Sequence, residues 1–203
     1  MDAGNRPRLG VFGAGNFGGR FTALARAAGY NVVVAGRENA VSVAEESQIF
    51  VLGIPFPACA SALPALAVAL TNKIVVDGTN PVKADWSPIT FGDRSSGGEE
   101  IAKLLPTSRV VKAFNTVFAD TMTKEGLMRD GQPVTTFVCG DDVAARQAVS
   151  ELAATLGFAP LDSGPLRICR YTEAIAHLNI QLAVVQGGGT NAALIYHMMK
   201  KHS

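Results

Sequence analysis

Short apolar runs alternate with helix-patterned stretches along most of this chain. Apolar, often β-branched runs predict buried strands at residues 9–12, 31–35, 48–53, 73–77, 109–113, 133–139 and 158–161. Helical patterns cover residues 16–29, 57–70, 98–105, 142–156, 170–186 and 190–200. Repeated strand–helix units with apolar strands predict a doubly wound α/β fold, in which helices cover both faces of a mostly parallel sheet.

The order of these segments predicts a single domain over residues 1–203. Residues 1–164 would form the sheet and its helices, and residues 165–203 would form a short helical C-terminal cap. The stretch 78–96 is rich in glycine, proline, aspartate and serine, which is typical of a loop.

A glycine-rich turn follows the first predicted strand directly. Residues 13–18 are GAGNFG, a GxGxxG motif that opens the first predicted helix and precedes a second strand. Gly13 would allow the tight turn, Gly15 would let backbone N–H groups approach a pyrophosphate, and Gly18 would let helix and strand pack closely. The dipole and the free N–H groups of the helix N-terminus favour an anion at the same place. The motif therefore predicts a Rossmann-like, dinucleotide-binding fold.

The residues after the second strand indicate which dinucleotide binds. An NAD site usually has a carboxylate there, which accepts a hydrogen bond from the ribose 2′-hydroxyl. This chain has Ala35, Gly36 and Arg37 instead. Because a guanidinium can pair with a phosphate through two hydrogen bonds, Arg37 predicts a site for the 2′-phosphate of NADP(H).

The sequence pattern offers no general acid or base near the predicted site. Dehydrogenases of alcohols and hydroxy acids use one, usually His, Lys or Tyr, but His177, His197 and His202 all lie in the predicted cap. The cap is also too short for a large helical substrate domain. A flat redox ring that exchanges hydride with the nicotinamide fits better. The strand ends at residues 54–56, 78–81 and 114–117 offer amides, hydroxyls and apolar surface for such a ring.

Composition and charge exclude several other classes of protein. A net charge of +1 gives no field that would attract nucleic acid. The longest apolar stretch, residues 58–70, contains Pro64 and is shorter than the roughly 20 residues of a membrane span. No apolar signal segment precedes the first strand, so we expect a cytoplasmic protein. Apolar cap helices favour a homodimer.

The three cysteines are Cys59, Cys139 and Cys169. Their number is odd and their spacing fits neither a disulfide framework nor a metal site. We therefore expect them to be reduced, small core residues.

Six segments together resemble a known family. They are GAGNFG at 13–18, AGR at 35–37, VVDGTNP at 75–81, VVKAFNTV at 110–117, FVCGDD at 137–142 and LDSGPLRICRYTEAIAHL at 161–178. In these segments the chain resembles the NADPH-dependent coenzyme F420 (deazaflavin) reductases. It is also similar to the cytosolic oxidoreductase domain of the STEAP-type metalloreductases.

The resemblance implies an NADPH-dependent enzyme that transfers hydride between the nicotinamide and a flavin (FMN or FAD) or coenzyme F420 ring. Catalysis on this reading is mostly positioning of the two rings, so we assign no catalytic acid or base, and we assign no metal-binding residue. Carried over by position, the residues that would bind the pyrophosphate are Gly13, Ala14, Gly15, Asn16 and Phe17. Those that would bind the remaining groups are Arg37 for the 2′-phosphate, Ile54 and Pro55 for the adenosine or ribose, and Asn80, Asn115 and Val117 for the nicotinamide and the ring.

Two alternatives stay open on the sequence alone. The chain could be a non-catalytic NADP-binding module that senses redox state or passes electrons to a partner. It could also be an imine-type reductase similar to pyrroline-5-carboxylate reductase, although little chain follows Gly164 to build the long helical dimerisation domain of those enzymes.

Overall fold

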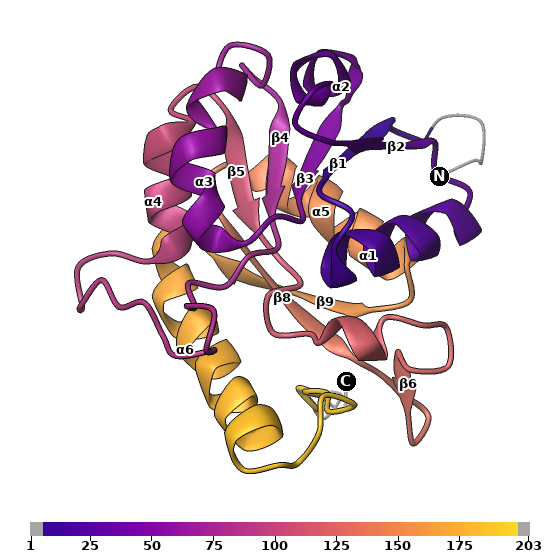
Figure 1. The fold of residues 1–203 in the computed structure, drawn as a ribbon. Helices are drawn as coiled ribbons and strands as arrows, with labels where there is room; N and C mark the ends of the chain where they lie inside the picture. Colours follow the sequence, from indigo (N-terminus) through magenta and orange to yellow (C-terminus); the bar gives the residue numbers. More distant parts are fainter. Residues whose placement is uncertain (1–5, 199–203) are drawn as a thin grey trace.

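Seven short strands form the central sheet of the structure, a computed structural model that describes residues 6–198 (Figure 1). They are β1 (Leu9–Phe12), β2 (Val32–Ala35), β3 (Ile49–Leu52), β4 (Ile74–Asp77), β5 (Arg109–Lys112), β8 (Thr135–Gly140) and β9 (Ala159–Gly164). Their order across the sheet is β2-β1-β3-β4-β5-β8-β9. Every neighbouring pair is parallel except β5 and β8. The predicted Rossmann-like, mostly parallel α/β fold is therefore confirmed.

Helices cover both faces of this sheet. They are α1 (Asn16–Ala27), α2 (Ala40–Glu46), α3 (Phe56–Ala62), α4 (Gly97–Leu104), α5 (Val143–Thr155) and α6 (Cys169–Ile180). Side chains of α1 and α5 pack in one core cluster, and side chains of α2, α3 and α4 pack in the other. Because both faces are covered, β1, β3 and β4 are buried along their whole length, which explains why they are apolar throughout except at Asp77, the last residue of β4.

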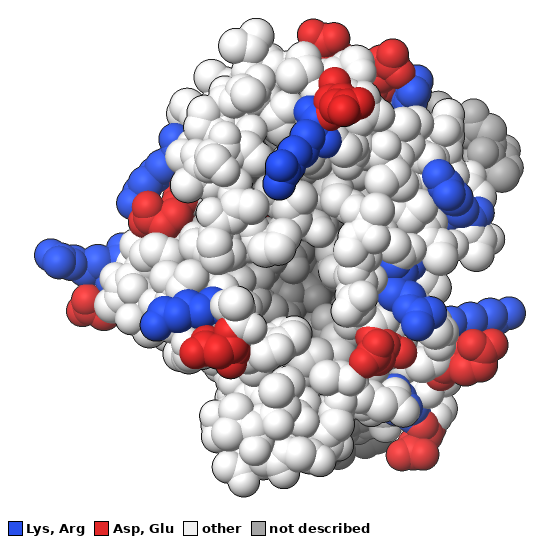
Figure 2. All heavy atoms as spheres, in the orientation of Figure 1, with Lys and Arg blue, Asp and Glu red and all other residues white. Residues whose placement is uncertain are grey.

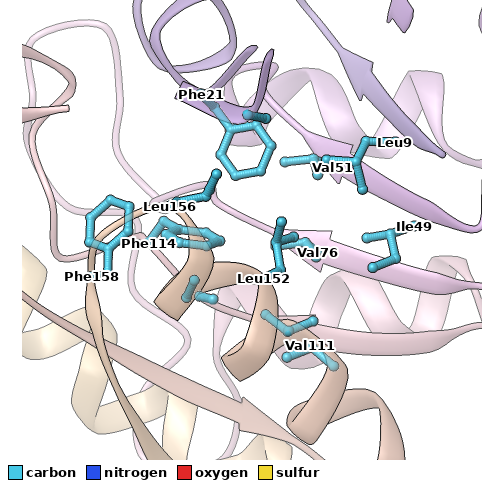
Figure 3. Packing of buried hydrophobic residues seen from close by; sticks show 14 of the residues in the cluster. Leu9, Phe21, Ile49, Val51, Val76, Val111, Phe114, Leu152, Leu156 and Phe158 are labelled. Carbon is cyan, nitrogen blue, oxygen red and sulfur yellow. The ribbon is translucent and has the colours of Figure 1, made fainter. Parts of the chain in front are cut away.

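The core on the α1 and α5 side shows how strands and helices meet (Figure 3). Phe21 of α1 and Leu152 of α5 lie over Val51, Val76 and Val111 from three adjacent strands, and all five are nearly or fully buried. Burying each side chain of this kind contributes about 1.5–3 kcal/mol relative to leaving it in water.

The strand order reverses at β1. The chain passes from β1 to β2 on one side and then to β3 on the other side. At such a switch point a crevice forms beyond the carboxyl ends of the strands, and α/β proteins bind ligands there. Gly13 follows β1, Gly53 follows β3, and the segments with Asn80 and Asn115 follow β4 and β5 at the same edge.

Two predicted segments differ from the structure, and one helix was not predicted. The helix predicted over 57–70 ends at Ala62, and a 3-10 turn (Pro64–Leu66) follows, because Pro64 lacks an N–H group and cannot continue the α-helix. Helix α2 occupies a stretch for which no element was predicted. A small hairpin of β6 (Met128–Arg129) and β7 (Gln132–Pro133) takes up the start of the strand predicted at 133–139.

The helix predicted over 190–200 is wrong across the described residues, and 199–203 lie outside them. After α6 the chain forms one π-helical turn (Gln181–Val185) and then, without further helix, runs back toward the sheet. We call residues 187–198 the C-terminal strap. The left-handed Gly187 and Gly189 turn the chain, and the carbonyl of Leu194 accepts a hydrogen bond from the N–H of Thr135 at 2.9 Å. The cap thus consists of α6, the π turn and the strap.

All three cysteines are buried and free, as predicted. Acidic and basic side chains are interspersed on the face in Figure 2. Within residues 6–198, no helix has both the length and the apolar character needed to cross a membrane.

Candidate functional site

A cavity of about 240 Å³ opens at the carboxyl edge of the sheet. Figure 2 shows a hollow near the middle of the viewed face, with walls that are mostly neither acidic nor basic. The walls come from the start of α1, the segments after β4 and β5, helix α6 and the strap. The lining residues are Asn16, Phe17, Gly78, Asn80, Trp86, Asn115, Thr116, Val117, Phe118, Ala119, Asp120, Ala176, Asn179, Ile180 and Thr190.

The structure brings together five of the eleven residues that the sequence singled out. Asn16, Phe17, Asn80, Asn115 and Val117 line this cavity. The other six lie at neighbouring strand ends and do not line it: Gly13, Ala14 and Gly15 between β1 and α1, Arg37 after β2, and Ile54 and Pro55 between β3 and α3.

Packing between β1 and α1 requires glycine at two positions, Gly13 in the turn and Gly18 in the first turn of the helix. Gly13 has a φ of +106°, and a Cβ atom there would lie 2.7 Å from the carbonyl oxygen of Gly53. A Cβ atom on Gly18 would lie 2.1 Å from the carbonyl oxygen of Gly13, so only glycine lets the helix approach the strand this closely.

Gly15 differs from both. A Cβ atom there would have no atom within 4 Å, so Gly15 borders open space. Gly15 is also the N-cap residue of α1, and neither a capping side chain nor an acidic residue occupies the first turn. The start of α1 therefore lacks a side-chain cap and borders open space at Gly15, and uncapped N–H groups at a helix N-terminus favour an anion.

Phe114 turns the chain after β5, just before Asn115. Its φ is +66°, a left-handed conformation that is costly for a bulky residue. The buried ring packs edge-to-face on Phe21 at 5.4 Å and on Phe158 at 5.2 Å between centroids (Figure 3). The N–H of Phe114 also donates to Oγ1 of Thr136 at 2.8 Å. These contacts hold the turn and thereby orient Asn115.

Two asparagines hold each other in the cavity wall. Nδ2 of Asn80 donates to the carbonyl of Asn115 at 2.6 Å, and Nδ2 of Asn115 donates to Oδ1 of Asn80 at 3.1 Å. Oδ1 of Asn115 and Oγ1 of Thr116 are buried and have no hydrogen-bond partner among the described residues. A buried polar atom without a partner costs about 1–3 kcal/mol. Both oxygens keep a free acceptor site, and both residues line the cavity.

A buried network of three charged residues, Asp77, Lys112 and Glu173, supports the strand ends that lead into the cavity. Nζ of Lys112 lies 2.7 Å from Oδ2 of Asp77 and 3.0 Å from Oε1 of Glu173. Glu173 also accepts hydrogen bonds from the N–H groups of Gly97 and Gly98 at 2.9 Å each. Burial opposes the charge on Lys112, but the two carboxylates outweigh it and raise the pKa of Lys112 above its ordinary range. The network ties β4, β5 and the N-terminus of α4 to α6.

Sequence reasoning missed the wall that α6 and the strap contribute. Asn179 lines the cavity, and its Nδ2 donates to the carbonyl of Thr116 at 3.2 Å. Thr190 of the strap donates to Asp120. A signal was present, because the buried positions of α6 recur at helical spacing yet include the polar residues Thr172, Glu173 and Asn179. His177 lines a different cavity.

Arg37 is exposed in the loop after β2. Within residues 6–198 its side chain has neither an ion pair nor a hydrogen bond. Oδ1 of Asn39 accepts a hydrogen bond from the N–H of Gly36 at 2.7 Å and so orders the loop beside it. The guanidinium is therefore available to an anionic ligand.

Several known proteins that are similar to this chain are named as reductases. Metalloreductase STEAP3 of Rattus norvegicus is 34% identical in an alignment 187 positions long that covers 83% of this chain and 36% of that protein. The F420-dependent NADP reductase of Methanocaldococcus jannaschii is 29% identical over 169 residues, covering 77% of this chain and 70% of that protein. The chain thus spans about a third of the length of the STEAP relative. No protein-family model matches the chain.

A solved structure shares the fold over nearly the whole chain. It is a protein from Arthrobacter sp. FB24 described as an F420-dependent NADP reductase, with a TM-score of 0.80 and 27% identity. The match covers 92% of this chain and 97% of that one. The chain is therefore a homologue of the F420-dependent NADP reductases and of the STEAP metalloreductases, as the resemblance of its motifs predicts.

Proposed function

We propose that this protein is an NADP(H)-dependent oxidoreductase that transfers hydride between the nicotinamide and a flavin or deazaflavin ring such as FMN, FAD or coenzyme F420. The observation that carries the proposal is the cavity where the start of α1 meets the paired Asn80 and Asn115, with two buried acceptor atoms left unpartnered. The kind of chemistry named in the homologues supports the same class.

The first part of the site would bind the phosphates. Backbone N–H groups at the start of α1 would donate to the pyrophosphate in the space beside Gly15. The unpartnered guanidinium of Arg37 would pair with the 2′-phosphate. Ile54 and Pro55, which follow β3, would flank the adenosine or its ribose.

The second part of the site would orient the nicotinamide. Oδ1 of Asn115 and Oγ1 of Thr116 would accept hydrogen bonds from the carboxamide, and Asn80 would hold Asn115 in place. Phe17 and Val117 would keep water away from the ring faces. When bound, NADPH supplies the hydride that reduces the acceptor ring. The residues of the chain would contribute to the rate by orientation, so the proposal assigns no proton-transfer residue.

An acceptor assay tests the proposal. The purified protein is mixed with NADPH and with riboflavin, FMN, FAD or coenzyme F420, and the absorbance of NADPH and of the ring is followed. We expect turnover with at least one ring. Gly15→Ala should raise the KM for NADPH about tenfold, because the new methyl group would occupy space assigned to the pyrophosphate.

Gly19→Ala is the matched control for that variant. Gly19 lies one turn further along α1, and a Cβ atom there would make only an ordinary contact, 3.6 Å from the carbonyl oxygen of Ala14. Its KM for NADPH should stay close to that of the unmodified protein. Equal effects of the two variants, or no reaction with any ring, would contradict the proposal. Tight NADPH binding without turnover would favour a non-catalytic NADP-binding sensor or electron-transfer module.

We also propose that the protein is a homodimer, with α6 at the interface. Tyr171, Leu178, Leu182 and Val185 lie along α6 and the π turn with 55–66% of their surface exposed. The stripe is uncharged, so two copies could bury it against each other without desolvating a charge. Replacing Leu178 and Leu182 together by glutamate should convert a dimer into a monomer in light scattering. Val68→Glu is the control, because Val68 is 89% exposed but lies elsewhere. A monomeric unmodified protein would refute this arrangement.

A further inference from the structure

The loop between β4 and α4 carries an exposed tryptophan to the edge of the cavity. Trp86 is the only tryptophan of the chain. It lines the cavity together with Phe17 and Phe118, and 47% of its surface is exposed. Phe17 already packs on Phe21, at 5.9 Å between ring centroids. Trp86 has no aromatic pair within residues 6–198, so its indole is available to a ligand.

The backbone at Trp86 is held in a conformation that bulky residues avoid. Its φ is +66°, in the left-handed region that favours glycine or asparagine. A non-glycine residue in such a conformation persists only where its surroundings impose it, and these residues are concentrated at ligand sites.

The surrounding loop imposes this conformation through local hydrogen bonds. The N–H of Trp86 donates to the carbonyl of Lys83 at 3.0 Å, and the N–H of Lys83 donates to the carbonyl of Ser87 at 2.8 Å. Oδ1 of Asp85 accepts from both the N–H and the hydroxyl of Ser87, at 3.0 and 2.6 Å. The turn is closed at its base by a bridge between Val82 and Pro88. The loop is thus a preformed turn that presents one large aromatic side chain.

The chemistry of the cavity indicates what this side chain would contact. Amide groups of Asn16, Asn80, Asn115 and Asn179 surround an otherwise largely apolar space, and Asp120 is the sole ionisable residue in the described lining. An amide-rich and aromatic lining with a single carboxyl group suits a planar heterocycle with ring nitrogens and carbonyl oxygens. The broad face of an indole can stack on such a ring.

We propose that Trp86 is a specificity-determining residue that stacks on the planar tricyclic heterocycle which exchanges hydride with the nicotinamide. The inference rests on the function proposed above and adds to it the residue that selects the acceptor. Because Trp86 belongs to the loop after β4 rather than to the glycine-rich turn, it would contribute to binding of the acceptor ring and not to binding of NADPH.

Tryptophan fluorescence tests the contact without turnover. In the presence of NADP⁺, which cannot donate hydride, riboflavin and coenzyme F420 are titrated separately against the protein. If a ring stacks on Trp86, it should quench most of the tryptophan emission, and the quenching should saturate as the ring concentration rises. We expect this with at least one of the two rings. NADP⁺ alone should change the emission little; strong quenching by NADP⁺ alone would place the indole at the dinucleotide instead and overturn the proposal.

The control moves the single tryptophan away from the cavity. In the double variant Trp86→Phe, Val68→Trp the fluorophore sits on an 89% exposed position before β4, whereas the cavity lies beyond the carboxyl end of that strand. The emission of this variant should fall only through the inner-filter effect, because the added ring absorbs light without contacting the tryptophan. Equal quenching in the control and in the unmodified protein would overturn the proposal.

Kinetics give a second and separate readout. Trp86→Ala should raise the KM for the ring acceptor about three- to tenfold, as expected for the loss of one aromatic stacking contact, with the KM for NADPH unchanged. Trp86→Phe should recover most of the loss because a smaller ring still stacks. Turnover with an unchanged acceptor KM in Trp86→Ala would refute the role of Trp86 and leave the proposed function intact. Absence of turnover and of quenching with every ring would refute both.

Discussion

Replacing Lys112 with methionine should lower the free energy of unfolding by about 3–5 kcal/mol, because it leaves the carboxylates of Asp77 and Glu173 buried without their cation. The side chains of Lys112 and Asp77 are fully buried, and that of Glu173 is 6% exposed. Water therefore cannot replace the lost partner. Urea denaturation followed by circular dichroism measures the change.

A triple variant separates the loss of charge balance from the loss of the lysine side chain itself. Combining Lys112→Met with Asp77→Asn and Glu173→Gln removes all three charges. The amide oxygens still accept a hydrogen bond from Thr79 and from one of the two N–H groups of Gly97 and Gly98. This variant should regain at least half of the lost stability. A single variant as stable as the unmodified protein, or a triple variant less stable than the single one, would contradict this account of the network.

The same network of Asp77, Lys112 and Glu173 determines how the stability of the protein depends on pH. The pKa of Lys112 is raised in the folded state, against the opposing effect of burial, by Asp77 and Glu173. A raised lysine pKa stabilises the folded chain fully below the unfolded value of about 10.4, and this contribution is lost as the pH rises beyond it. The difference in stability between the unmodified protein and Lys112→Met should therefore persist at neutral pH and shrink only in strong alkali.

Replacing Arg37 with alanine should raise the KM for NADPH about 10- to 150-fold while leaving the KM for NADH nearly unchanged. The reason is the loss of charge-assisted hydrogen bonds, worth about 1.5–3 kcal/mol, to a phosphate that NADH lacks. Arg37→Lys should give an intermediate value, because an ammonium group keeps the charge but not the two parallel hydrogen bonds. Steady-state kinetics with both cofactors measure the ratio.

Arg167→Ala is the matched control for this charge change. Arg167 is also exposed, but it borders a different cavity formed with α4. Its removal alters the net charge equally and should leave both KM values unchanged. A parallel rise for NADPH and NADH in Arg37→Ala would show that the guanidinium does not select the phosphorylated cofactor.

Local patterns predicted the strands and the glycine-rich turn. The predicted strand 9–12 coincides with β1, because a parallel strand buried on both faces reads as a nearly continuous apolar run. Gly13 and Gly18 could be recognised because the spacing itself reflects a close approach of backbone to backbone. The segments with Asn80 and Asn115 could be placed at one edge because parallel strands end on the same side.

Features that depend on distant contacts could not be predicted in this way. Lys112 stands in a strand-like run and gives no sign of its buried partners on β4 and α6. The strap has a helix-like apolar pattern, but Ala193 packs on the core and Leu194 bonds to Thr135, and these tertiary contacts outweigh helix propensity. The role proposed for Trp86 depends on a left-handed backbone that composition does not reveal.

Helix α6 contributes side chains both to the cavity and to the exposed outer surface of the molecule. Ala176, Asn179 and Ile180 face the cavity, whereas Leu178 and its exposed neighbours face outward. A rigid helix cannot move one side without the other. If a second copy covers the outward side, ligand binding and subunit association become thermodynamically linked. The factor by which a ligand changes the association constant of the subunits is then also the factor by which association changes the affinity for that ligand.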